Sequence, residues 1–207
     1  MRSLIQKRAA HIIPLLSLAT AACAAPQTFD FKDPKGVNNA IFKTDAPLES
    51  INGSANGISG SVSFDPENPA ATTGKITVTT ASLTVPNPMM NGHLHSDKWL
   101  DAAKFPEITF EAKSLANVKT EGAVTTAEVT GTFTLHGVSK ELTAPVKLTY
   151  LKDKLASRVP NLKGDLLVIR ASFVINRGDF DINKGQFEDK VSNTIDLSLS
   201  IAGASAK

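Results

Sequence analysis

Three histidines are the side chains of this chain whose type and spacing could do chemistry. His93 and His95 share a face if their segment is extended, and His136 could approach them from elsewhere in the fold. Three converging imidazoles could bind Zn²⁺ or Cu²⁺. Two neighbours plus one distant histidine form a weak pattern, however, and no cysteine is available beside them. We therefore expect no metal site, and a weak histidine-based metal-binding protein remains an alternative.

Ser96 follows His95, and the acids Asp97 and Asp101 are close in sequence, which raises the question of a hydrolytic triad. No Gly-x-Ser-x-Gly motif surrounds Ser96, and residues adjacent in sequence rarely build a triad. The glycine-rich run 53–60 lacks a lysine and a following helix, so it is typical of a turn that leads into a strand rather than of a phosphate loop. We expect no enzyme, no catalytic residues and no cofactor.

The elements that must position these side chains are mostly β-strands. From about Gln27 onward, short segments with period-two alternation are separated by Gly, Pro, Asn and Asp. Strands are predicted over 39–44, 58–64, 75–85, 106–113, 127–135, 142–150, 166–175 and 195–201, with hairpin connections at 120–122 and 161–164. Segment 166–175 is apolar on both faces, as in a strand covered on both sides. About eight antiparallel strands predict an all-β barrel that is either filled or holds one slim ligand.

Helix is scarce in this pattern. Ser96 is an N-cap candidate for the segment 96–104, and Pro106 stands two residues after its end. We expect one short helix there.

The inward positions of the strands combine bulky and small side chains. The alternation predicts that the side chains of Phe110, Val129, Phe133, Leu148 and Phe173 point inward. Small residues are expected on the same face: Gly60, Gly131, Ala112, Ala144 and Ala171. Small residues inside a barrel leave room for a ligand, although glycine and alanine can equally serve strand curvature.

The N-terminus has the layout of a secretory signal. Arg2, Lys7 and Arg8 precede an apolar or small stretch at 12–22 that is too short to span a bilayer. Two processing sites compete: cleavage after Ala24, giving a signal peptide of residues 1–24, or a lipoprotein signal of residues 1–22 with Cys23 acylated. We expect export across the inner membrane to the periplasm, with a membrane tether if Cys23 carries lipid.

The length of the chain limits the number of domains, and its charge limits the kinds of partner. A chain of 207 residues predicts one domain. The basic residues of the signal account for most of the net charge, which leaves 19 basic against 20 acidic side chains from Cys23 onward. No cluster of Lys or Arg with interleaved aromatics remains, so we expect no nucleic-acid partner.

Several motifs along 28–203 together resemble the YceI-like family of bacterial periplasmic lipid-binding proteins. They are Phe64-Asp65-Pro66, Gly92-His93-Leu94-His95-Ser96 leading into Trp99-Leu100-Asp101, Phe105-Pro106-Glu107-Ile108-Thr109-Phe110, Leu135-His136-Gly137-Val138, and Ile175-Asn176-Arg177-Gly178-Asp179-Phe180. The resemblance implies an extended, lipocalin-like, eight-stranded antiparallel barrel that binds a polyisoprenoid. The opening departs from the family pattern, since Phe29-Asp30-Phe31 and Gly36-Val37-Asn38-Asn39 offer neither of the family's N-terminal histidines.

The expected function is storage or transport of a long polyisoprenoid, such as an isoprenoid quinone or a prenyl alcohol, in an apolar channel. The expected tail-binding residues are Phe64, Met89, Met90, Leu94, Trp99, Leu100, Phe105, Phe110, Val129, Phe133, Leu135, Leu148 and Phe173. The candidates for a head-group or loop role are His93, His95, His136 and Arg177. The large apolar side chains from Met89 to Phe105 could instead only cap the barrel, so a structural barrel without a ligand is the other alternative.

Overall fold

Three long strands with a clear apolar and polar face form one side of the molecule. The computed structural model describes residues 25–207, and in it β7 (Glu107–Glu121), β8 (Val124–Leu135) and β9 (Val138–Leu151) pair in sequence as an antiparallel meander. The β8–β9 connection has only two residues, His136 and Gly137, both with positive φ (52° and 75°), as a type I′ turn requires.

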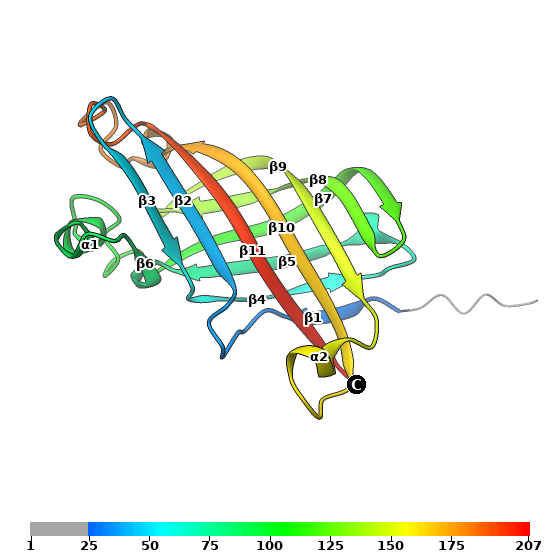
Figure 1. Ribbon diagram of the computed structural model, residues 1–207. Coiled ribbons are helices and arrows are strands. Elements are labelled where there is room, and N and C mark those ends of the chain that lie inside the picture. The colour runs from blue at the N-terminus through cyan, green and yellow to red at the C-terminus, as the bar shows by residue number, and fades with distance from the viewer. Residues whose placement is uncertain (1–24) are drawn as a thin grey trace, which may run out of the picture.

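Eight strands close into an antiparallel barrel, in agreement with the sequence-based prediction of fold and strand number, but the strand at 27–30 takes the place in the ring that was expected for 39–44. The others are β1 (Gln27–Asp30), β4 (Ile58–Phe64), β5 (Thr73–Thr79), β10 (Gly164–Asn176) and β11 (Thr194–Ala206). Their order around the barrel is β1-β4-β5-β7-β8-β9-β10-β11, and the pairing of Asp30 with Ala204 closes it. The series of paired strands thereby closes on itself, and the strands surround a common interior (Figure 1).

A second group of strands branches from β11 and leans away from the barrel axis at one end. It consists of β2 (Asn39–Asp45), β3 (Ser50–Ala55) and the short β6 (Leu83–Thr84). The edge of β11 pairs with β1 near its C-terminal end and with β2 over 196–200, so one edge serves two strands. In Figure 1 the β2–β3 hairpin therefore extends beyond β4 toward the end of the molecule that carries α1.

One expected strand and one expected turn have different bounds in the structure. The segment 75–85 is not one strand, because β5 ends at Thr79 and a 3-10 turn, η2 (Thr80–Ser82), leads into β6. The run 53–60 contains the end of β3 and the start of β4 rather than only a turn. In both places the chain changes sheet neighbours, which the alternation pattern alone does not reveal.

The short helix lies earlier than predicted. It is α1 (Pro88–His95), and residues 96–104 form turns. The Asn87 side chain accepts hydrogen bonds from the amides of Met89 and Met90, and Pro88 occupies the first turn, where its missing N–H is harmless. Ser96 stands at the C-terminal end, where its amide and its hydroxyl both donate to the carbonyl of His93.

Short helical segments cover the remaining connections. They are η1 (Pro69–Ala71), α2 (Leu155–Arg158) and η3 (Arg177–Phe180). α2 contacts β10 and β11 from outside with the buried Leu155, so β10 is covered on both faces only near its start. Further along β10, Val174 is exposed, in contrast to the prediction from the sequence. Among the described residues, no helix is both long and apolar enough to cross a bilayer.

Candidate functional site

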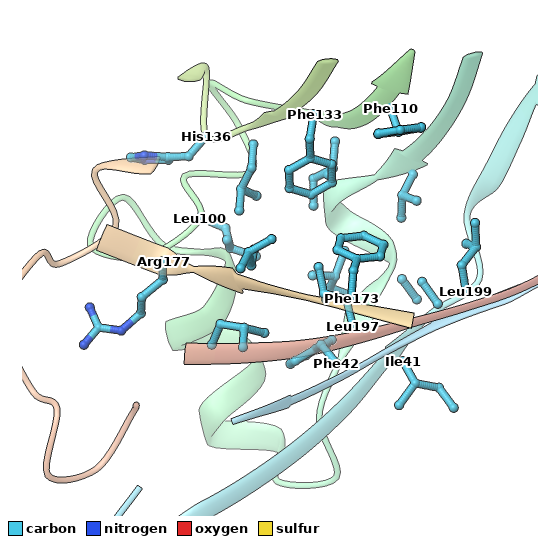
Figure 2. Close-up of a pocket in the computed structure, with 18 of the residues that line it drawn as sticks. Ile41, Phe42, Leu100, Phe110, Phe133, His136, Phe173, Arg177, Leu197 and Leu199 are labelled. Atoms are coloured by element: carbon cyan, nitrogen blue, oxygen red, sulfur yellow. The ribbon is translucent and has the colours of Figure 1, made fainter. Parts of the chain in front are cut away.

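The barrel encloses one large cavity, of about 1020 Å³, in the described part of the chain. This volume is at the upper end of the roughly 300–1,000 Å³ that is usual for small-molecule sites. Side chains from the barrel strands, from β2 and from the segment after α1 line it. In Figure 2, Leu100, Phe133 and Phe173 project into a shared space.

The deep half of the cavity owes its room to small side chains. Three of them line it: Ala112, Ala144 and Ala171. Strand β7 is also bulged between Ala112 and Ser114, which bends the wall there. The five side chains that the alternation places inside, Phe110, Val129, Phe133, Leu148 and Phe173, all line this cavity.

Two of the expected small residues do not contribute cavity space. A Cβ on Gly131 would lie 2.4 Å from the Glu111 carbonyl oxygen and 2.6 Å from the Phe110 ring. A Cβ on Gly60 would lie 2.1 Å from the Lys75 carbonyl oxygen. These glycines allow close approach of neighbours within the wall, so the interpretation that they make room for a ligand is wrong.

Aromatic side chains fill the barrel at the end where β9 finishes. Phe64 packs against Phe29 and Tyr150 with ring centroids 6.5 and 5.9 Å apart, and both phenylalanines are almost completely buried. Phe64 therefore lies outside the cavity lining and belongs to this cluster, which we call the aromatic plug (Phe29, Phe64 and Tyr150). The plug closes the interior beyond Leu148.

A buried carboxylate fixes the polar end of the plug. The hydroxyl of Tyr150 donates to Asp165 at 2.8 Å, and the Asp153 amide and the Lys207 ammonium also donate to this carboxylate. Burial alone would raise the pKa of Asp165, but these hydrogen bonds together outweigh it and hold the pKa below its ordinary value. The Asp165 carboxylate in turn raises the pKa of Tyr150, in addition to the effect of burial.

Polar side chains gather at the opposite end, which we call the mouth. They come from the β2–β3 hairpin, from the turns after α1, from the β8–β9 turn and from the loop that follows η3: Glu49, His93, Asp97, Lys98, His136, Arg177, Asp181, Asn183, Gln186 and Lys190. The cavity thus has one apolar closed end and one polar end. An amphiphile with a long tail and a small polar head fits this arrangement.

Most of the sequence-predicted residues are brought together here. The cavity lining includes Met90, Leu94, Trp99, Leu100 and Leu135 besides the five inward side chains. Met89 is 75% exposed on the outer side of α1, and Phe105 packs outside the cavity against the His136 ring at 4.6 Å. His95 also lies outside, because its Nε2 donates to the Leu83 carbonyl at 2.8 Å.

Of the head-group and loop roles that the sequence left open for Arg177, the structure shows the loop role. Its guanidinium is almost completely buried and donates to the carbonyls of five residues: Ile182, Asn183, Gln186, Val191 and Ser192. The Cζ atom of the guanidinium lies over the Trp99 ring, 5.7 Å from its centroid. Burial lowers the pKa of Arg177, while the nearby Glu188 carboxylate opposes that shift.

The loop after η3, residues 181–193, crosses the mouth and is held on both sides. The Asn183 side chain donates to the Lys98 carbonyl at 2.6 Å, and the Leu48 amide of the β2–β3 hairpin donates to the Asp189 carbonyl at 2.9 Å. Phe187 packs on Trp99 with centroids 6.1 Å apart, although its φ of 58° is unfavourable for a bulky residue. We call residues 181–193 the mouth loop.

The histidines do not converge. His95 is tied to Leu83, and the Nδ1 of His136 lies 3.2 Å from the Phe180 carbonyl oxygen. His93 is exposed on α1. Within residues 25–207, no group of three or more His, Cys, Asp or Glu side chains is placed to hold a metal ion.

Comparison with known sequences identifies one family. The model of the YceI-like domain matches residues 35–202. A UPF0312 protein of Enterobacter sp. (strain 638) is 39% identical over 89 residues, which cover 43% of this chain and 44% of that protein. Protein YceI of Salmonella arizonae is 38% identical over 89 residues, 43% of this chain and 44% of that protein. The chain thus spans under half the length of these curated relatives.

Solved structures share the fold at low sequence identity. Burkholderia cenocepacia BcnA has a TM-score of 0.64 and 21% identity, over 80% of this chain and 95% of BcnA. A domain from Saccharophagus degradans, described as polyisoprenoid binding and implicated in plant cell wall breakdown, has a TM-score of 0.61 and 12% identity, over 87% of this chain and 99% of that one.

Proposed function

The chain belongs to the YceI-like family, and from this membership together with the one-ended apolar cavity we propose that it binds a long polyisoprenoid lipid without covalent attachment. The observation that carries the proposal is the cavity of about 1020 Å³, which is apolar in its depth and polar at its mouth. A barrel with a purely structural role would fill this space with side chains. The polyisoprenoid-binding domain of similar fold supports the same choice of ligand class.

The affinity would come from burial of the tail. At roughly 25 cal/mol per Å² of apolar surface removed from water, a tail of several hundred Å² contributes on the order of 10 kcal/mol before the cost of ordering it. The unbranched side chain of Met90 at the mouth can adapt to an irregular chain. The polar side chains at the mouth would remain in contact with the head group and with water.

The biological setting belongs to the same proposal. Residues 1–24, which carry the predicted signal and Cys23, lie outside the described residues. Export to the periplasm, with or without a lipid anchor at Cys23, is the setting that the sequence pattern favours. There the protein would store a water-insoluble isoprenoid or carry it between membranes, and it would act as a carrier rather than as an enzyme.

The proposal is tested by purifying the protein from its own host, followed by native mass spectrometry and lipid extraction. We expect a bound mass that a solvent extract identifies as an isoprenoid quinone or a prenyl alcohol. The extracted protein should then take up added polyisoprenoid at a ratio of one to one. Absence of any isoprenoid in the extract, together with no uptake by the lipid-free protein, would refute the proposal.

A further inference from the structure

The mouth contains a buried cation that is not free to bind a head group. A guanidinium has five N–H donors. Those of Arg177 are directed at five backbone carbonyls of the mouth loop, two from each terminal nitrogen and one from Nε. An anionic head group could take one of these donors only by leaving a buried carbonyl unpaired. Arg177 therefore holds the mouth loop and does not serve as an anion site.

Asn183 is a half-buried side chain at the mouth, and its amide nitrogen also makes a hydrogen bond to the protein backbone. It donates to the Lys98 carbonyl across the mouth. The amide oxygen of Asn183 remains, and an oxygen of this kind can only accept. The guanidinium donors of Arg177 and one amide donor of Asn183 are thus directed at backbone carbonyls, and the amide oxygen of Asn183 remains as an acceptor for a ligand.

His136 is another half-buried polar side chain of the mouth. Its tautomer follows from its hydrogen bond to the Phe180 carbonyl. The Phe180 carbonyl oxygen can only accept a hydrogen bond, so Nδ1 of His136, 3.2 Å away, must carry the hydrogen. In the neutral ring Nε2 then has a free lone pair. None of the hydrogen bonds found among the described residues uses this nitrogen.

The ring of His136 is held in place on three sides. The type I′ turn fixes its backbone, the Phe180 carbonyl fixes Nδ1, and the edge-on Phe105 ring packs at 4.6 Å. His136 lines the cavity, and Figure 2 shows it on the same side of the cavity as Arg177. A fixed acceptor at the polar end of an apolar cavity is suited to select among head groups.

We propose that Nε2 of His136 accepts a hydrogen bond from the head group, so that the cavity selects isoprenoids that end in a hydroxyl. Prenyl alcohols and reduced quinols have such a donor, whereas ethers and oxidised quinones of the same tail offer only acceptors. This inference rests on the proposed function, since it concerns the head group of the same ligand. One neutral hydrogen bond of this kind corresponds to a preference of about three- to tenfold.

The first test compares three probes with identical tails: geranylgeraniol, geranylgeranyl methyl ether and geranylgeranyl phosphate. Their affinities for the lipid-free wild-type protein are measured by quenching of Trp99, the only tryptophan of the chain. We expect the alcohol to bind about three- to tenfold more tightly than the ether. Equal affinity of alcohol and ether, or tightest binding of the phosphate, would overturn the inference while leaving the proposed function intact. If no probe binds, both fall together.

The second test observes the histidine directly in the wild-type protein labelled with ¹⁵N-histidine. We expect the NMR signals of His136 to show a protonated Nδ1 and an unprotonated Nε2, and the Nε2 signal to move with the alcohol but not with the ether. His95, which lies outside the cavity lining, is the internal control whose signals should respond equally to both probes. An Nε2 of His136 that carries the proton, or that does not respond to the alcohol, would contradict the proposal even if no variant folds.

The third test uses a matched pair of variants. His136→Asn places a residue that tolerates positive φ in the turn and shortens the side chain, so the preference should fall below about twofold while binding of the ether is retained. Ser139→Asn, on the outer face of β9 just after the same turn and outside the cavity lining, should keep the wild-type preference. If the His136→Asn protein keeps the wild-type preference for the alcohol over the ether, another side chain must bind the head group.

Discussion

The side chain of Asn38 makes hydrogen bonds to both backbone groups of Ala202. The Ala202 amide donates to the Asn38 side-chain oxygen at 2.9 Å, and the Asn38 amide nitrogen donates to the Ala202 carbonyl at 3.2 Å. Ala202 lies where the edge of β11 passes from β1 to β2, between the partners of these two strands. Asn38 therefore replaces the missing strand neighbour at the point where the wall of the barrel divides.

Replacing Asn38 by alanine should destabilise the barrel by about 1–3 kcal/mol, because the Ala202 amide and the Phe31 carbonyl lose the Asn38 side chain as a partner. Urea unfolding followed by circular dichroism measures the change. Asn39→Ala is the matched control, since its amide makes only an exposed bond to the Val37 carbonyl. Equal unfolding midpoints for the two variants would show that the Asn38 contacts contribute nothing to stability.

The Arg177→Lys variant should lose about 3 kcal/mol of stability, because an ammonium cannot reach carbonyls arranged around a planar fork. The emission of Trp99 should shift as well, since the guanidinium lies over that ring. Arg170→Lys provides the control: Arg170 is exposed and donates only to the carbonyls of Ile169 and Ile201. An unchanged unfolding midpoint in Arg177→Lys would contradict the anchoring role.

Filling the cavity should abolish lipid uptake without unfolding the protein. Ala144→Leu adds bulk at a buried position that lines the cavity, so uptake of a polyisoprenoid should fall at least about tenfold, with a stability change below about 1 kcal/mol. Thr143→Leu, outward on the same strand, should bind as the wild type does. A loss of about 1–3 kcal/mol in lipid-free Ala144→Leu would instead indicate a filled interior.

Stability should decrease in acid through Asp165. Its pKa is below the ordinary value in the folded state, so the ionised carboxylate stabilises the fold fully above the unfolded pKa of about 3.9. This stabilisation is lost as the pH falls from there through the folded pKa. Urea midpoints between neutral pH and pH ~2 should therefore decrease less in Asp165→Asn than in the wild type. Asp196→Asn, which changes an exposed aspartate, should behave as the wild type does.

If Cys23 is acylated, the Cys23→Ser variant should move from the membrane fraction to the soluble fraction of the periplasm. Stable anchoring requires at least two acyl chains, and each buried methylene contributes about 0.8 kcal/mol. Fractionation of host cells followed by immunoblotting measures the distribution. Identical partitioning of wild type and variant would favour cleavage after Ala24 and a protein without a lipid anchor.

The strands that sequence reasoning predicted are those with one apolar and one polar face. β8 and β9 alternate so regularly that their inward side chains follow directly. β3 was missed because its sequence, Ser-Ile-Asn-Gly-Ser-Ala, is typical of a loop. It is a strand because the edge of β2 supplies its hydrogen bonds, and that partner is remote from any local pattern.

The site was predicted more fully in its apolar part than in its polar part, where only His93, His136 and Arg177 of the mouth side chains were expected. Trp99 and Leu100 were expected in the cavity from residue type and family motif, and they line it. The sequence left a head-group and a loop role open for Arg177, because its partners are backbone carbonyls of an irregular loop and carry no residue signature. The helix was misplaced because Ser96 and Asn87 are both good capping residues, and only Asn87 precedes a proline.

The aromatic plug makes the cavity a dead end, which fixes the order of events in any exchange of lipid. A flexible chain can enter such a space only with its tail tip first, and it must leave with its head first. A donor and an acceptor would therefore both meet the same end of the protein, and they could not be engaged on opposite sides at once. The donor and the acceptor would therefore contact the mouth one after the other, and lipid would enter and leave the protein through that same opening.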